Sequence, residues 1–330
     1  MEEKIDEVIG QYEVRVLEKR RVRGGMLLET DDGFFTLTGY KENLARLSFT
    51  EQVKQELIEQ GYPYVDQGIR NINGEWLTKD HMGDRWHMKR WYAGKECNLS
   101  DEVQVQKAAA HLAALHRLLV MGAEHTDRIV QKNMEAMFER RTKEMRRVYN
   151  YVKQKKRKND MEIRLLNLFS PFSEQAEQAV DELKKIGYRE LLENEVNAGK
   201  IFHGSYSYHN ILFGENGKVI TTNFEKSAYG IQIVDFYDFL RKFLEKNNWE
   251  IHRGIRVLHA YMEEKPLEKR EGAFLYILLS FPEKFWKQMN FYYNGKKSWM
   301  SMKNLDKLRK IEQQEENRRK FLKEAKRVLI

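Results

Sequence analysis

The stretch from His203 to Glu225 constrains the fold of this chain more than any other segment. It reads HGSYSYHNILFGENGKVITTNFE. Its runs Ile211–Phe213 and Lys218–Phe224 predict two strands, and the residues Gly214–Gly217 between them predict the turn of a hairpin. A loop of polar residues and glycine precedes the hairpin, so we expect a polar loop to lie against its first strand.

The residue types in this loop and hairpin are largely those of a phosphotransferase site. Phosphoryl transfer to a hydroxyl needs a carboxylate near the acceptor and oxygen ligands that hold Mg²⁺ against nucleotide phosphates. A kinase-type loop has an aspartate two residues after a histidine, an asparagine five residues later and a second aspartate beyond a hairpin. Here His203 and Asn210 keep that spacing, but Ser205 stands at the catalytic-base position and Asn223 at the metal-aspartate position. Glu225 follows as an acidic oxygen donor.

The motif resembles that of the aminoglycoside phosphotransferase and choline kinase group, H-G-D-x-x-x-x-N followed by a D-F-D-like triplet. Within that group it is most similar to the CotS-type spore-coat proteins of endospore-forming bacteria. Two later segments extend the resemblance: Ile233–Arg241 is similar to the aspartate-led helix after the metal strand, and the segment from Phe281 to Trp299 is similar to one typical of the coat-protein branch. The resemblance implies an α+β, two-lobed protein-kinase-like fold, with a small antiparallel sheet and one helix in the N-lobe and a larger, mainly helical C-lobe.

Composition along the first 94 residues agrees with such an N-lobe. An amphipathic pattern over Asn43–Glu59 predicts its helix. We expect residues 1–94 to form the N-lobe and residues 95–330 the C-lobe, with the catalytic loop at 203–210 and the metal strand at 218–225. Strand-like composition predicts the remaining elements of the N-lobe: strands at Tyr12–Arg21, Met26–Thr30, Phe34–Thr38 and Trp86–Trp91, and a hairpin of Val65–Arg70 with Glu75–Leu77.

The resemblance also implies where phosphate contacts would lie in the N-lobe. The lysine that pairs with the phosphates falls at Thr38, so that position lacks its cation. Without a cation, Glu51 on the predicted helix is expected to be solvated. The turn at Gly24 and Gly25 would cover the phosphates, although paired glycines between strands more often form only a tight turn. ATP and Mg²⁺ are therefore the implied cofactors, with weak binding of both expected.

Two histidines and the only cysteine are interpreted as structural. Ser100 is expected to cap a helix that carries His111 and His116, whose i, i+5 spacing does not place both on one face as a metal pair requires. Cys97 rules out an internal disulfide and has no catalytic motif around it.

Length and apolar content fit either one two-lobed unit or two modest domains. The chain has 330 residues, 41% of them hydrophobic, which suffices for a core. No apolar run approaches the length of a membrane span, and the acidic start MEEKIDEVIG does not have the form of a signal peptide. We expect synthesis in the cytoplasm and, if the resemblance holds, deposition on the forespore or spore coat.

Positive charge is concentrated in one stretch. From Glu139 to Lys158 the chain has ten Lys or Arg and two acids, a local balance of +8 that equals the net charge of the whole chain. A solvated helix face is the default interpretation, and the alternative is a docking surface, Arg140–Lys158, for a spore-coat protein or another acidic partner. Nucleic acid is not favoured, because no recognition module accompanies the stretch.

Two functions remain open. The replacements at Thr38, Ser205 and Asn223 favour a catalytically impaired kinase-like protein, a pseudokinase, that acts as a binding or assembly component of the spore coat. The alternative is an active small-molecule phosphotransferase that transfers the ATP γ-phosphate to a hydroxyl in a rebuilt site. In that alternative Asn210 and Glu225 ligate the metal, and Asp235 or Glu225 serves as the displaced acid.

Overall fold

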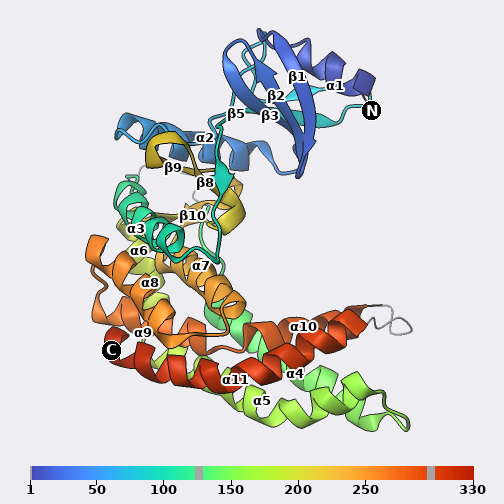
Figure 1. Ribbon diagram of the computed structural model, residues 1–330, viewed down its shortest axis with the longest axis vertical. Helices are drawn as coiled ribbons and strands as arrows, with labels where there is room; N and C mark the ends of the chain where they lie inside the picture. The colour runs from blue at the N-terminus through green and yellow to red at the C-terminus, as the bar shows by residue number, and fades with distance from the viewer. Residues whose placement is uncertain (1, 123–128, 296–301) are drawn as a thin grey trace.

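The computed structural model describes residues 2–122, 129–295 and 302–330, which form two lobes (Figure 1). Residues 296–299 of the coat-like segment lie outside the described residues. The smaller lobe contains an antiparallel sheet in the order β1-β2-β3-β5-β4, and the larger lobe is mainly helical. The predicted α+β arrangement is confirmed. The sheet strands are β1 Val16–Val22, β2 Gly25–Thr30, β3 Gly33–Gly39, β4 Thr78–Lys79 and β5 Arg85–Trp91.

The two faces of this sheet differ in chemistry. One face carries Phe35, Leu37 and Met88, which form a small core with Ile5 and other residues of the N-terminal segment. The helix α1, Glu2–Ile9, belongs to that segment and was not expected from the sequence. Strand alternation places Thr36, Thr38, His87 and Lys89 on the opposite face. The second face is therefore polar, and it carries the side chains of the sheet that belong to the predicted catalytic site.

Helix α2, Leu44–Glu59, joins the sheet to the larger lobe. Its N-cap Asn43 accepts a hydrogen bond from the backbone N–H of Arg46, which satisfies one free donor of the first turn. The guanidinium of Arg46 donates to the carbonyl of Ser227 at 2.8 Å. A residue of the first lobe is thus bonded to the segment that follows the predicted metal strand.

The predicted hairpin of Val65–Arg70 with Glu75–Leu77 is wrong. Gly68 instead forms an isolated antiparallel bridge with Lys89 of β5, and Val65 forms a parallel bridge with Thr221 of the second lobe. The turn chemistry that suggested a hairpin is present, because Asn71 Oδ1 accepts from the backbone N–H groups of Asn73 and Glu75. The turn only closes a local loop, and the flanking segments pair with distant strands.

The larger lobe is built around one extended apolar core. Its first helix, α3, begins after Asp101, whose side chain accepts from Gln104 N, so the prediction of Ser100 as the cap is wrong by one residue. None of the described helices is long and apolar enough to cross a membrane. The helices are α3 Glu102–Leu118, α4 Met134–Gln154, α5 Asp160–Lys185, α6 Tyr188–Asn197, α7 Ile233–Lys246, α8 Ile251–Glu264, α9 Lys269–Ser280, α10 Glu283–Asn294 and α11 Met302–Leu329.

Short strands in this lobe surround the predicted catalytic loop. The hairpin predicted from the sequence is present, with β8 paired to β9 and to the strand that follows the interlobe crossing. The β7–β10 pair lies on either side of the loop in sequence. These elements are β6 Lys95–Glu96, β7 Ile201–Phe202, β8 Ile211–Phe213, β9 Val219–Thr221 and β10 Ala228–Tyr229, with 3₁₀ turns η1 Tyr208–Asn210, η2 Glu215–Gly217 and η3 Phe224–Lys226.

Helices α4 and α5 pack side by side and form an arm at the end of the larger lobe away from the sheet (Figure 1). The basic stretch forms all of α4 beyond its first five residues, together with the turn into α5. Arg141 pairs with Glu283 at 2.5 Å, Arg146 pairs with Glu177 at 2.7 Å, and Lys155 pairs with the buried Glu162. Part of the stretch therefore stabilises the helical packing.

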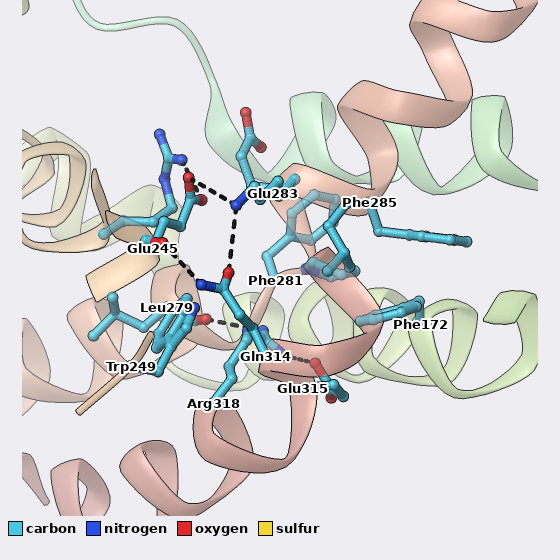
Figure 2. Close-up of a pocket in the computed structure, with 14 residues that line it drawn as sticks. Phe172, Glu245, Trp249, Leu279, Phe281, Glu283, Phe285, Gln314, Glu315 and Arg318 are labelled. Atoms are coloured by element: carbon cyan, nitrogen blue, oxygen red, sulfur yellow. Dashed lines mark hydrogen bonds and ion pairs between the residues drawn. The ribbon is translucent and has the colours of Figure 1, made fainter. Parts of the chain in front are cut away.

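A small hollow beneath α11 is part of this packing and has the volume of about one water molecule. Its volume is about 30 Å³. Figure 2 shows Gln314 directed toward Glu245, whose carbonyl accepts from the Gln314 amide at 3.0 Å. Arg318 donates to the carbonyls of Leu279 and Ser280 from the same side. These bonds fasten α11 to α7 and α9, and we assign the hollow no ligand.

Candidate functional site

The carboxylate of Asp235 holds the predicted catalytic loop in place. Asp235 lies in the first turn of α7 and is 2% exposed. Its oxygens accept from the backbone N–H groups of His203 at 2.6 Å and Gly204 at 2.7 Å. The same carboxylate lies 3.2 Å from His116 Nε2, and His116 Nδ1 lies 2.7 Å from the hydroxyl of Tyr261. These contacts favour a positioning role for Asp235 and His116 over the alternative in which Asp235 is a displaced acid.

The ring of His203 connects the loop to the strand that follows. Its Nε2 lies 3.1 Å from the carbonyl of Thr222, and its Nδ1 lies 3.1 Å from the backbone N–H of Ser205. The carbonyl can only accept and the N–H can only donate, so the ring proton is on Nε2. Burial lowers the pKa of His203 and keeps the ring neutral. His203 has a positioning role in this geometry.

Gly204 is required by the path of the loop. Its φ is +74°, and a Cβ at this position would lie 2.2 Å from the carbonyl oxygen of Lys226. Both the backbone conformation and the close approach exclude other residues. The glycine predicted from the motif thus brings the loop against the segment that follows the metal strand.

Three side chains form a continuous chain of hydrogen bonds at the predicted metal position. The amide of Asn210 donates to the carbonyl of Ser205 at 2.8 Å. Asn223 Nδ2 donates to Asn210 Oδ1 at 2.7 Å, and Lys89 Nζ donates to Asn223 Oδ1 at 3.2 Å. This series of hydrogen bonds begins at a carbonyl, which only accepts, and ends at an ammonium, which only donates. The orientations of the Asn210 and Asn223 side-chain amides are therefore fixed.

Asn223 adopts a left-handed backbone conformation, with φ 66° and ψ 61°. Asparagine is one of the few residues with a side chain that tolerates this region. Its backbone N–H donates to Asp66 Oδ2 at 2.9 Å. The strained conformation directs the side chain toward Asn210 and Lys89, at the position where the motif has a metal ligand.

A buried lysine lies in the site, but not at the predicted position. Thr38 is half-buried on β3 and is paired in register with His87. The lysine is Lys89 on the neighbouring strand β5, directly across from Thr36 and 2% exposed. Its Nζ lies 2.8 Å from Asp66 Oδ2 and 2.5 Å from Glu225 Oε1.

Glu51 is buried, so the prediction that it is solvated is wrong. It is 5% exposed, accepts from the backbone N–H of Gly68 at 2.8 Å and pairs with Lys54 on the same helix. The cation that pairs with Glu51 is therefore Lys54 of the same helix, α2. Burial raises the pKa of Glu51, although Lys54 opposes this effect.

Asp66, Lys89 and Lys54 were not predicted from the sequence to be residues of the site. A signal was available for Lys89, because in the strand Arg85–Trp91 the alternate positions His87 and Lys89 share one face. Polar residues on an inward face of a central strand indicate a functional or ion-paired site. Asp66 and Lys54 had no comparable local signal, since their burial depends on contacts between distant segments.

Gly24 lies in the turn between β1 and β2, and Gly25 is the first residue of β2, at the end of the sheet where Thr38 and His87 lie. Gly24 has φ +82° and no atom within 4 Å of an added Cβ. Gly25 would place a Cβ 2.3 Å from the carbonyl of Leu37. The tight turn accounts for both glycines, and a phosphate-binding role stays a prediction.

The residues present do not fit a Mg²⁺ ion of the kinase type. Asn210 Oδ1 and Asn223 Oδ1 are the neutral oxygens at the predicted metal positions, and both accept hydrogen bonds from neighbouring side chains. One oxygen of Glu225 is bonded to the Lys89 ammonium. Within the described ranges, no group of three or more His, Cys, Asp or Glu residues is arranged to hold a metal ion. We therefore derive no catalytic step through a bound metal.

A larger pocket opens beside Glu225. It has a volume of about 630 Å³ and is lined by residues of α2, α4, α7 and α10, among them Arg46, Asp238, Glu283 and Trp286. Aromatic and charged side chains of both signs share its wall. Such a wall suits a ligand that has both apolar surface and polar groups.

Solved structures with the same fold include phosphotransferases. An aminoglycoside phosphotransferase from Alicyclobacillus acidocaldarius is 18% identical, with a TM-score of 0.87, and the match covers 98% of this chain and 95% of that chain. A spectinomycin phosphotransferase bound to AMP is 11% identical, with a TM-score of 0.62 and coverage of 95% and 97%. An amicoumacin kinase is 13% identical, with a TM-score of 0.59 and coverage of 97% and 93%.

These likenesses and the two-lobed architecture define the protein-kinase-like fold. A comparison with curated proteins finds no match. The family model described as "Spore coat putative kinase YutH" matches residues 5–325. The chain belongs to this spore-coat family, and the resemblance predicted from the sequence is confirmed.

Replacing Gly204 by alanine should destabilise the fold by at least about 2 kcal/mol, because the new methyl group would meet a backbone carbonyl in a left-handed conformation. Gly24→Ala is the matched control, since it has a similar φ but open space, and should cost about 1 kcal/mol. Urea unfolding of both variants measures the difference. Equal losses would show that the contact with Lys226 does not matter.

The ion pair of Glu225 should make stability depend on pH in acid. Burial opposes the charged form, but the Lys89 ammonium outweighs burial and lowers the pKa of Glu225 to about 2. A carboxyl group whose pKa is lower in the folded state stabilises the fold above its unfolded pKa, and this contribution disappears as pH falls toward the folded pKa. Wild type should exceed Glu225→Gln by about 1–2 kcal/mol at pH 6.5, with the gap closing between about pH 4.5 and 2.

Free energies of unfolding of the two proteins, measured from pH 6.5 downward, test this expectation. Glu316→Gln provides a control, because Glu316 pairs with Lys320 on the exposed surface of α11 and should change stability little at any pH. A constant difference between wild type and Glu225→Gln across the acid range would contradict the assignment.

Proposed function

We propose that this protein is a catalytically impaired, kinase-like component of the spore coat that acts by binding other proteins. The observation that carries the proposal is the 2.7 Å hydrogen bond between Asn223 and Asn210, the two side chains at the metal positions. Two amides bonded to each other do not neutralise phosphate charge as a carboxylate-bound Mg²⁺ does.

The acceptor side of the site supports the same proposal. Ser205 stands where a carboxylate would take the proton of the acceptor hydroxyl, and a serine hydroxyl is a poor general base without a partner that activates it. Among the described contacts, the Ser205 hydroxyl has only the Asn210 amide as a neighbour, at 3.4 Å. An amide cannot remove its proton.

Charge around the cleft also disfavours a nucleotide without a metal. Lys54 and Lys89 face three carboxylates, those of Glu51, Asp66 and Glu225. In their usual charged forms these five groups sum to −1. A polyphosphate would meet no net positive charge here, so weak ATP binding is part of the proposal.

The alternative, an active small-molecule phosphotransferase, is favoured by one observation. The pocket of about 630 Å³ beside Glu225 has room for a polar acceptor. Glu225 would then have to leave Lys89 to act as a base. A transfer assay therefore decides between the two functions.

Purified protein is expected to transfer no γ-phosphate from ATP to aminoglycosides, choline-like alcohols or itself, because the site lacks both the base and the metal carboxylate. Incorporation of radiolabelled phosphate is the measurement, with heat-treated protein as the blank. Incorporation above the blank that disappears in Asn210→Ala would establish the active alternative.

We also propose that docking to acidic coat partners uses the basic surface, Arg140–Lys158. Lys143 and Arg147 lie one turn apart on α4, and Lys156 and Arg157 lie in the turn that follows. All four are exposed, and none has an acidic partner within ion-pair distance among the described residues. Exposed like charges that repel one another attract an acidic surface at long range.

Replacing Lys143, Arg147, Lys156 and Arg157 with glutamine should weaken capture by the coat and reduce its salt dependence, while leaving stability nearly unchanged. The variant spares Lys155, whose loss would leave the buried Glu162 without its cation. Glutamine at Lys307, Lys310, Lys320 and Lys323 of α11 removes the same charge elsewhere and serves as the control.

Coat localisation of fluorescent fusions in sporulating cells, together with pull-down at low and moderate salt, measures the effect. Equal loss in both variants would indicate that only net charge matters. Unchanged capture of the α4 variant would place the partner surface elsewhere.

A further inference from the structure

The ammonium of Lys89 lies at the centre of a ring of oxygen atoms from both lobes. It is bonded to Asp66 Oδ2 at 2.8 Å, Glu225 Oε1 at 2.5 Å and Asn223 Oδ1 at 3.2 Å. Lys89 and Asp66 belong to the N-terminal lobe, whereas Asn223 and Glu225 follow β9 in the other lobe. One side chain therefore holds together oxygens that would otherwise repel each other across the lobes.

Asp66 provides a second, independent sign of a cation site. The residue is fully buried, and its Oδ1 has no hydrogen-bond partner among the residues that the structure describes. Its Oδ2 is shared between Lys89 and the backbone N–H of Asn223. A fully buried carboxylate with a free oxygen, next to a second carboxylate and one ammonium, leaves the position with an excess negative charge.

The oxygen types around Lys89 Nζ are those that small divalent cations bind. Carboxylate and amide carbonyl oxygens are the usual ligands of Mg²⁺ and Mn²⁺. An ammonium is a compact cation with three donors, and here it has three oxygen partners. Burial opposes its charge, but Asp66 and Glu225 outweigh burial and raise the pKa of Lys89, so the group stays protonated.

We propose that Lys89 is a built-in cation that occupies a latent divalent-metal site made of Asp66, Asn223 and Glu225. Removing the ammonium vacates the position and leaves two carboxylates and an amide oxygen directed into it. A divalent ion then replaces the lost charge. This inference deepens the proposed function. It rests on that function, because it takes the native site to work without a bound metal ion.

The test compares Mn²⁺ binding by wild type and Lys89→Met, whose unbranched apolar stem keeps the packing but not the charge. In chelator-treated buffer the variant should melt at a lower temperature than wild type. Added MnCl₂ should restore much of the loss, because a ligand that binds only the folded state stabilises it. Calorimetric titration should show Mn²⁺ binding at least about tenfold tighter than to wild type.

Two further variants make the assignment specific. Lys89→Met combined with Asp66→Asn should lose the gained Mn²⁺ affinity, whereas Lys89→Met combined with Asn223→Asp should increase it. Lys200→Met, which breaks a pair with Glu195 elsewhere in the lobe, should gain no Mn²⁺ binding. Lys89→Gln replaces Lys89→Met if the latter does not fold, with the same expectation.

Equal Mn²⁺ affinity in wild type and the Lys89 variants would overturn the proposal, as would no binding by either variant. Phosphate transfer by wild type would overturn the proposed function instead. The two failures are distinguishable, because the titration needs neither nucleotide nor acceptor.

Discussion

The carboxylate of Asp235 is the interaction on which the geometry of the site depends. By accepting two backbone N–H groups of the loop, it fixes the start of that loop against α7, and His116 and Tyr261 complete its surroundings. Removing a buried carboxylate of this kind would leave several donors without a partner. An acid thus shapes the loop, whereas Ser205 and Asn223 stand where the sequence resemblance implies a catalytic base and a metal ligand.

The loop can keep its conformation without carboxylates at Ser205 and Asn223. Asn210 still bonds the carbonyl of Ser205, and Asn223 still takes the left-handed conformation that brings its side chain toward Asn210. Neither bond needs a carboxylate. The contact between the lobes uses charges of the chain itself, because Lys89 pairs with acids of both lobes. In this fold the loop and the lobes are thus held by hydrogen bonds and ion pairs among the chain's own residues.

The sequence predicted those parts of the fold that local chemistry determines. The 203–225 motif identified the loop, the β8–β9 hairpin and Gly204, since each depends on residues close together in the chain. Predictions from the sequence were wrong where contacts between distant segments determine the strand pairing or the position of a charged side chain. The bridges of Gly68 to Lys89 and of Val65 to Thr221 overrode a good turn signal, and the cation of the site came from β5 instead of β3. Burial of Glu51 and Asp66 followed from those long-range contacts.

The length of α4 has a consequence for how the molecule can be arranged in a layer. The helix has 21 residues and begins beside β10, so its far end lies about 30 Å along its axis from that start. A partner protein bound at that end would lie far from the interlobe region. The sheet lies at the opposite end of the molecule (Figure 1). If the proposed docking surface is used, one end of the molecule is held and the sheet at the other end stays free to meet a different surface.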